Sequence, residues 1–162
     1  PAMDVSHPRV IRMRTFSKAY GLAGLRVGYA IGHHELIRAF DKIRNHFGMG
    51  RIAQAGALAA LKDQDYLNQT VQKITQARAE IARIVQENGL TPLPSATNFV
   101  AVDCGRDGAY AAALLKELTK RGVFLRMPAI APLNRTIRIS CGDAAMLAHL
   151  EAELPKALTA LG

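Results

Sequence analysis

A lysine and an arginine lie eight residues apart in a glycine-rich stretch of this 162-residue sequence. The stretch RTFSKAYGLAGLRVGYAIG spans residues 14–32 and includes the amine of Lys18 and the guanidinium of Arg26. A lysine amine that is partly desolvated near other cations becomes a nucleophile, and arginine can grip a phosphate with two hydrogen bonds. Thr15 and Ser17 add hydroxyl donors to the same segment. Together these groups suit a phosphorylated ligand that carries an aldehyde.

The same residues also fit a simpler interpretation. Lysine and arginine in a glycine-containing turn are commonly solvated surface charges. The glycines match neither the dinucleotide-binding fingerprint nor the Gly-Lys-Ser/Thr signature of a phosphate-binding loop. Spacing alone therefore leaves both a surface role and a ligand-binding role open for Lys18 and Arg26.

The string TFSKAYGLAGLRVGY, residues 15–29, resembles the lysine motif of the class I/II aminotransferases, which are fold-type I pyridoxal-phosphate enzymes. Its form is similar to that of the histidinol-phosphate aminotransferase branch. The resemblance implies that Lys18 is the catalytic residue and binds pyridoxal phosphate covalently. It further implies that Arg26 binds the cofactor phosphate, with help from the hydroxyls of Thr15 and Ser17.

Two further segments resemble the same family. IRISCGD, residues 137–143, is similar to the C-terminal strand whose arginine grips the substrate carboxylate, and Arg138 takes that position. A bidentate arginine–carboxylate pair would orient an amino acid for reaction. SATNFVAVD, residues 95–103, resembles a strand of the small domain, where we expect Asn98 to have no catalytic role.

Hydrophobic periodicity and turn residues predict the elements that position these groups. Strands and helices alternate in an α/β pattern, which agrees with the family fold. The predicted strands span residues 9–14, 26–31, 98–103, 123–126 and 136–140, and the predicted helices span residues 35–47, 51–61, 65–88, 108–121 and 144–158.

The helices carry recognisable signals. Asp107 and Asp143 are placed to cap the N-termini of the last two helices. Residues 65–88 form one long amphipathic helix with an apolar stripe, ending at Asn88-Gly89. Its stripe consists of Leu67, Val71, Ile74, Ala77, Ile81, Ile84 and Val85. By the family resemblance, residues 1–64 are the end of the large cofactor-binding domain with the last strands of its mostly parallel sheet, and residues 65–162 are the bridging helix and the small C-terminal α/β domain.

Composition excludes several classes of protein. Apolar residues make up 49% of the chain, which excludes a disordered or low-complexity protein. The net charge of +8 favours an anionic partner, but 6% aromatic residues and no Trp argue against a base-stacking, single-strand-binding protein. No apolar run is long enough to span a membrane, and no Cys/His spacing predicts a metal site. Cys104 and Cys141 are interpreted as reduced thiols of a cytoplasmic protein, with a disulfide left open.

The resemblance covers only the back half of the family's length. We therefore expect a fragment that is inactive on its own, because the residues that tune the cofactor ring belong to the other half of such enzymes. The complete enzyme would be a homodimer that transfers an amino group between an amino acid and a 2-oxo acid. Two alternatives stay open: a decarboxylase of the threonine-phosphate type, and a basic module that binds nucleic acid without catalysis.

Overall fold

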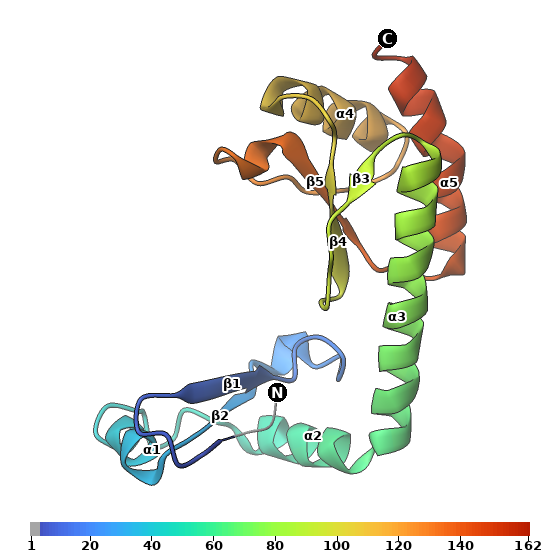
Figure 1. Ribbon diagram of the computed structural model, residues 1–162. Helices are drawn as coiled ribbons and strands as arrows, with labels where there is room; N and C mark the ends of the chain where they lie inside the picture. Colours follow the sequence, from blue (N-terminus) through green and yellow to red (C-terminus); the bar gives the residue numbers. More distant parts are fainter. Residues whose placement is uncertain (1–3) are drawn as a thin grey trace. The chain divides into compact units, whose positions relative to one another are not determined.

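The computed structural model describes residues 4–162 of the chain. By its internal contacts the chain divides into two compact units, Pro1–Val71 and Gln72–Gly162. Figure 1 shows helix α3, Gln64–Glu87, as one uninterrupted helix that runs from the first unit into the second. The predicted domain boundary after residue 64 stays a prediction.

The first unit is built on two antiparallel strands, β1 and β2, paired so that Thr15 lies opposite Gly28. A side chain at Gly28 would bring its Cβ within 2.7 Å of the Arg14 carbonyl oxygen, so glycine is required for this pairing. The pairing is antiparallel throughout, whereas a mostly parallel sheet is predicted for the complete domain. The elements of this unit are β1 (Ile11–Thr15), the 3-10 helix η1 (Ala23–Leu25), β2 (Gly28–Gly32), α1 (His34–Asp41) and α2 (Arg51–Lys62).

Three predicted boundaries in this unit are wrong. The first strand begins at Ile11 and not at Arg9, because the Val10 amide donates to the His7 carbonyl at 3.3 Å and closes a turn there.

The second strand begins at Gly28 and not at Arg26, because Arg26 has left-handed backbone angles (φ 54°, ψ 43°) that no strand can hold. The first helix ends at Asp41 and does not continue to residue 47. Beyond it, the Asn45 side chain accepts a hydrogen bond from the Phe47 amide at 3.0 Å, which favours a turn over helix.

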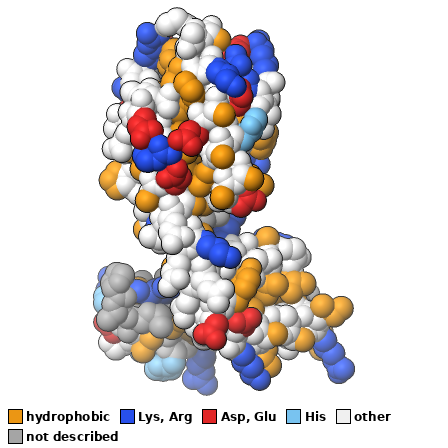
Figure 2. Space-filling view, turned by 90° about the vertical axis from the view of Figure 1, so that its right-hand side faces the viewer, with side chains coloured by type: hydrophobic (Ala, Val, Ile, Leu, Met, Phe, Trp, Pro, Cys, Tyr) orange, Lys and Arg blue, Asp and Glu red, His pale blue; other side chains and the backbone are white. Residues whose placement is uncertain are grey.

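The first unit has a small core of its own. Its buried hydrophobic residues are Phe16, Val27 and Ala57. Many of its other large apolar side chains are exposed, and Figure 2 shows hydrophobic side chains gathered on its surface. The most exposed of them are Met13, Ile43, Phe47, Ile52 and Leu58. Burial within this unit alone therefore stabilises it only weakly.

The second unit is a three-stranded antiparallel sheet in the order β3-β4-β5, packed with helices. The predicted caps are confirmed, since the Asp107 and Asp143 side chains each accept a backbone N–H of the following helix at 2.9 Å. Its elements, besides α3, are β3 (Thr91–Pro92), β4 (Phe99–Asp103), α4 (Gly108–Lys120), the 3-10 helix η2 (Leu133–Arg135), β5 (Thr136–Ser140) and α5 (Ala144–Thr159).

One face of this sheet forms the core. Val100 pairs with Ile139 and Val102 pairs with Ile137, and all four are buried under the helices. Side chains alternate between the two faces of a strand, so Phe99, Ala101 and Arg138 belong to the opposite face. The helices contribute Ala77, Ile81, Ile84 and Val85 from α3, Ala111, Leu114 and Leu118 from α4, and Leu147, Leu150, Leu154 and Ala157 from α5.

The predicted strand at residues 123–126 is wrong. Only Arg126 makes a β-bridge, with Arg138 of β5. The segment starts as the end of α4: Gly122 has φ +78°, and the Val123 amide donates to the Leu118 carbonyl at 2.9 Å. The Val123 amide is therefore used by the end of α4. For this reason the alternation of buried and exposed residues at 123–126 does not lead to a ladder of hydrogen bonds with β5.

No helix among residues 4–162 is both long and apolar enough to cross a membrane. Both cysteines are free thiols in the structure. Burial raises the pKa of the Cys104 thiol to about 11 and also raises that of Cys141, so the neutral thiol is favoured for both.

Candidate active site

The loop between β1 and β2 is anchored by one buried ring. Phe16 is only 2% exposed, and its amide donates to the Val27 carbonyl at 3.1 Å. Its carbonyl accepts from the Leu22 amide at 2.9 Å, which closes the loop on the other side. Because Phe16 points into the core, its neighbours Thr15 and Ser17 are directed away from it.

Lys18 lies at the start of a tight turn in this loop. The Gly21 amide donates to the Lys18 carbonyl at 2.8 Å, and Gly21 has φ +69°, which a residue with a Cβ adopts only at a cost. The Lys18 side chain is exposed. Within residues 4–162 no carboxylate is in ion-pair distance of its amine, which leaves that amine available to a ligand.

The two hydroxyls predicted to bind phosphate are in direct contact. Thr15 Oγ1 donates to Ser17 Oγ at 2.9 Å, and the Ser17 amide donates to Thr15 Oγ1 at 3.0 Å. In this arrangement the hydroxyl proton of Ser17 is still available for donation. The structure therefore links Thr15 and Ser17 directly, with the exposed Lys18 as the next residue in the chain.

Arg26 precedes β2 in a conformation that is rare for its residue type. It is the one non-glycine residue with positive φ among the described residues. Such backbone strain costs on the order of 1 kcal/mol and is concentrated at functional sites. Nη1 of Arg26 donates to the Ala23 carbonyl at 2.7 Å, which leaves other N–H donors of the guanidinium free.

These four residues fit a phosphorylated aldehyde. The β1–β2 pairing continues by one hydrogen bond, between Phe16 and Val27. Ser17 comes directly after Phe16 in the chain and Arg26 directly before Val27, so both residues adjoin the last paired position. A guanidinium and a hydroxyl donor can bind phosphate oxygens, and a primary amine can bind an aldehyde carbon.

Arg138 lies in the second unit, in the middle of β5 and opposite Ala101 of β4. Its side chain is half-buried, with its Cζ atom 4.7 Å from the centroid of the Phe99 ring. No carboxylate of the described part of the chain forms an ion pair with it. An arginine without an acid partner on the open face of a sheet is suited to binding an external anion.

Sequence reasoning missed a second arginine beside Arg138. The Arg138 amide donates to the Arg126 carbonyl at 2.6 Å, and the Arg126 amide donates back at 3.4 Å. Residues paired in this way project their side chains from the same face of the sheet, where two like charges repel each other unless an anion intervenes. Only the register across strands reveals this pair, since nothing in the local pattern around Arg126 indicates it.

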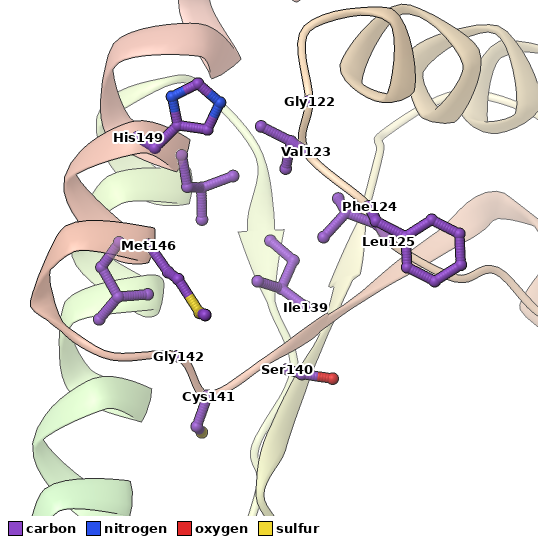
Figure 3. A pocket seen from close by; sticks show the side chains of 12 residues that line it. Gly122, Val123, Phe124, Leu125, Ile139, Ser140, Cys141, Gly142, Met146 and His149 are labelled. Carbon is purple, nitrogen blue, oxygen red and sulfur yellow. The ribbon is translucent and has the colours of Figure 1, made fainter.

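A cavity of about 330 Å³ lies elsewhere in the second unit, and none of the predicted site residues lines it. Figure 3 shows Met146 and His149 on α5 facing the segment that begins at Val123, and Ile139 of β5 lines the same cavity. The lining is almost entirely apolar, and His149 Nε2 already has a partner in the Arg121 carbonyl at 2.9 Å. The cavity therefore lacks the polar groups that the predicted chemistry requires.

The family model "Aminotransferase class I and II" matches residues 2–154. The chain belongs to the class I and II aminotransferases. This aminotransferase chain is 40% identical over 156 residues to histidinol-phosphate aminotransferase 2 of Hydrogenovibrio crunogenus, an alignment that covers 94% of the chain. It is 43% identical over 137 residues, or 85% of the chain, to histidinol-phosphate aminotransferase of Bacillus pumilus. The family resemblance predicted from the sequence is thus confirmed.

Solved structures agree with the aminotransferase fold. The histidinol-phosphate aminotransferase of Sinorhizobium meliloti, crystallised in complex with pyridoxal-5'-phosphate, matches with a TM-score of 0.91 and 56% identity over 96% of this chain. The expected α/β, fold-type I class is confirmed. The match covers 42% of that structure, and the two curated relatives are covered to 40% and 37%. The chain therefore spans about two fifths of the length of the aminotransferases it matches.

The two alternatives are not favoured. An L-threonine-O-3-phosphate decarboxylase from Porphyromonas gingivalis matches with a TM-score of 0.76 but 19% identity, which shows a shared fold only. On the second unit, Figure 2 shows acidic side chains among the basic ones, and Arg83 is ion-paired with Glu80, Glu87 and Glu151. The face of the second unit shown in Figure 2 is therefore not the continuous basic face that a nucleic-acid-binding module uses.

Proposed function

We propose that the protein to which this chain belongs transfers an amino group between an amino acid and a 2-oxo acid, with pyridoxal phosphate as cofactor. The observation that carries the proposal is the donor set of the β1–β2 loop. Residues 15–26 contain a lysine amine that has no ion-pair partner among residues 4–162, the two linked hydroxyls of Thr15 and Ser17, and Arg26 with its strained backbone. The pyridoxal phosphate in the Sinorhizobium meliloti structure supports the same cofactor.

Each residue of the loop has a distinct role in this proposal. When bound, pyridoxal phosphate supplies an aldehyde and an electron-withdrawing ring. Lys18 would hold the aldehyde through Nζ, while Arg26, Ser17 and Thr15 would bind the phosphate. As a free amine, Lys18 Nζ would take the proton from the substrate carbon that bears the amino group and would later return one.

Arg138 would orient the substrate by binding its carboxylate through two parallel hydrogen bonds. The names of the relatives favour histidinol phosphate, an amine that carries a phosphate and no carboxylate, as a substrate besides the amino acid. Arg126 and Arg138, whose backbones pair with each other, have the charge to bind either a carboxylate or a phosphate. The complete enzyme is proposed to be a homodimer, and this chain alone is predicted to lack activity.

Replacing Arg26 by glycine separates the effect of its strained backbone on stability from the effect of its guanidinium on cofactor binding. Glycine adopts positive φ freely, so the free energy of unfolding is expected to stay within about 1 kcal/mol of the original value or to rise slightly. The dissociation constant for pyridoxal phosphate is expected to increase by about tenfold or more, because one charge-assisted contact with the phosphate is lost. Thermal denaturation and absorbance titration of the full-length protein measure the two effects.

Arg44→Gly is the matched control for this prediction, since Arg44 is an exposed loop arginine whose partner is Asp41 at 2.6 Å. Its substitution should leave cofactor affinity unchanged. If Arg26→Gly binds pyridoxal phosphate as tightly as the original protein does, Arg26 is not part of the phosphate site.

The proposed function as a whole is tested by locating the cofactor. The full-length protein is titrated with pyridoxal phosphate, reduced with borohydride and digested, and the modified peptide is identified by mass. We expect one saturable adduct, on Lys18. Lys62, an exposed lysine at the end of α2, serves as the internal control and should remain unmodified. Absence of an adduct on Lys18 in the full-length protein would overturn the proposal.

A further inference from the structure

We propose that Phe99 is a positioning residue that holds the guanidinium of Arg138 ready for the substrate carboxylate, an inference that rests on the proposed function of Arg138. Phe99 pairs with Ser140 and Ala101 pairs with Arg138, so Phe99 is the diagonal neighbour of Arg138 on the same face. The Arg138 Cζ atom lies 4.7 Å from the centroid of the Phe99 ring. This distance is within the range of an attractive cation–π contact.

An aromatic ring suits this role better than a carboxylate would. A long arginine side chain has many rotamers, and ordering it on substrate binding would weaken that binding. A neighbouring carboxylate side chain would also order the guanidinium, but it would compete with the substrate carboxylate for the N–H groups of Arg138. The Phe99 ring accepts no conventional hydrogen bond, so it restricts Arg138 and leaves all five N–H donors available.

The segment before β4 fixes Phe99 in turn. Ser95 Oγ donates to the Phe99 carbonyl at 2.5 Å, and Thr97 Oγ1 does so at 3.2 Å. The Cys141 amide donates to the Asn98 carbonyl at 2.9 Å, which ties this segment to the end of β5. The SATN sequence therefore has a structural role, because it fixes the start of β4 and with it the place of the Phe99 ring.

The test compares Phe99→Leu with Phe99→Tyr in the full-length enzyme. Leucine keeps the apolar contact but removes the ring, so KM for the amino acid substrate should rise about three- to tenfold, with kcat nearly unchanged. Tyrosine keeps the ring and should retain the original KM. Phe124→Leu is the matched control, because Phe124 is 77% exposed and makes no ring contact with a cation among the described residues. An unchanged KM in Phe99→Leu, or an equal rise in Phe124→Leu, would overturn the inference.

A second readout does not depend on turnover. Acetate is titrated into the full-length protein while the Nε–Hε resonance of Arg138, assigned with Arg138→Lys, is followed by NMR. The acetate concentration at half-saturation should be about three- to tenfold higher in Phe99→Leu than in the original protein or Phe99→Tyr. Equal half-saturation in all three proteins would overturn the positioning role. A full-length protein that lacks transamination refutes the proposed function, and the acetate titration then decides this inference by itself.

Discussion

Lys18→Arg is expected to abolish transamination by the full-length enzyme, lowering kcat by roughly 10⁴-fold, the upper end of what a general acid–base group contributes. Arginine preserves the positive charge and much of the side-chain volume. Its guanidinium does not lose a proton at accessible pH, so it can neither bind an aldehyde carbon nor accept the substrate proton. Steady-state assays with saturating cofactor measure the change in kcat.

The structure makes Lys18→Arg a specific test. The Lys18 side chain is exposed, and its backbone carbonyl alone takes part in the turn with Gly21, so the substitution should not disturb the loop. Lys42→Arg, at an exposed residue just after α1, is the control and should retain full activity. Activity of Lys18→Arg within tenfold of the original enzyme would show that another residue moves the proton.

Arg138→Gln is expected to lower kcat/KM for amino acid substrates by about 100-fold or more, because a hydrogen bond to a charged group contributes about 1.5–3 kcal/mol. Most of the loss should fall on KM if the carboxylate contact forms equally in the ground state. Arg138→Lys keeps the charge but not the planar fork, so its kcat/KM should lie between those of Arg138→Gln and the original enzyme.

The fold around Arg138 should survive both substitutions, since its pairing with Arg126 uses backbone atoms only. Arg106 is a suitable control: it also lies over an aromatic ring, that of Tyr110 at 4.6 Å, but on an exposed surface. Arg106→Gln should leave kcat/KM unchanged. If Arg106→Gln and Arg138→Gln reduce kcat/KM equally, the effect is one of general stability and not of carboxylate binding.

The sequence predicted those features that depend on local chemistry. Asp107 and Asp143 cap their helices as expected, because a cap is made within four residues. In the long helix, the later stripe residues Ile81, Ile84 and Val85 are buried as predicted, whereas Val71 is 48% exposed. Helical periodicity identifies an apolar face but does not say which part of it is covered.

The features that the sequence did not predict depend on distant residues. The left-handed backbone of Arg26 interrupts what the local pattern indicates as a strand. The pairs Arg126–Arg138 and Phe99–Arg138 exist only through the register of segments that are far apart in the chain. The roles of Lys18 and Arg138 came from resemblance to a family, since spacing alone left their roles open.

The two units should differ in how readily their backbones open to solvent. Local opening is easiest where few apolar side chains are buried, and the first unit buries Phe16, Val27 and Ala57 within itself. Amide hydrogens in β1 and β2 are therefore expected to exchange with water through small fluctuations, whereas those of β4 and β5 should exchange only when most of the second unit unfolds. Any ligand held by Lys18 and Arg26 would slow exchange in the first unit in proportion to its occupancy.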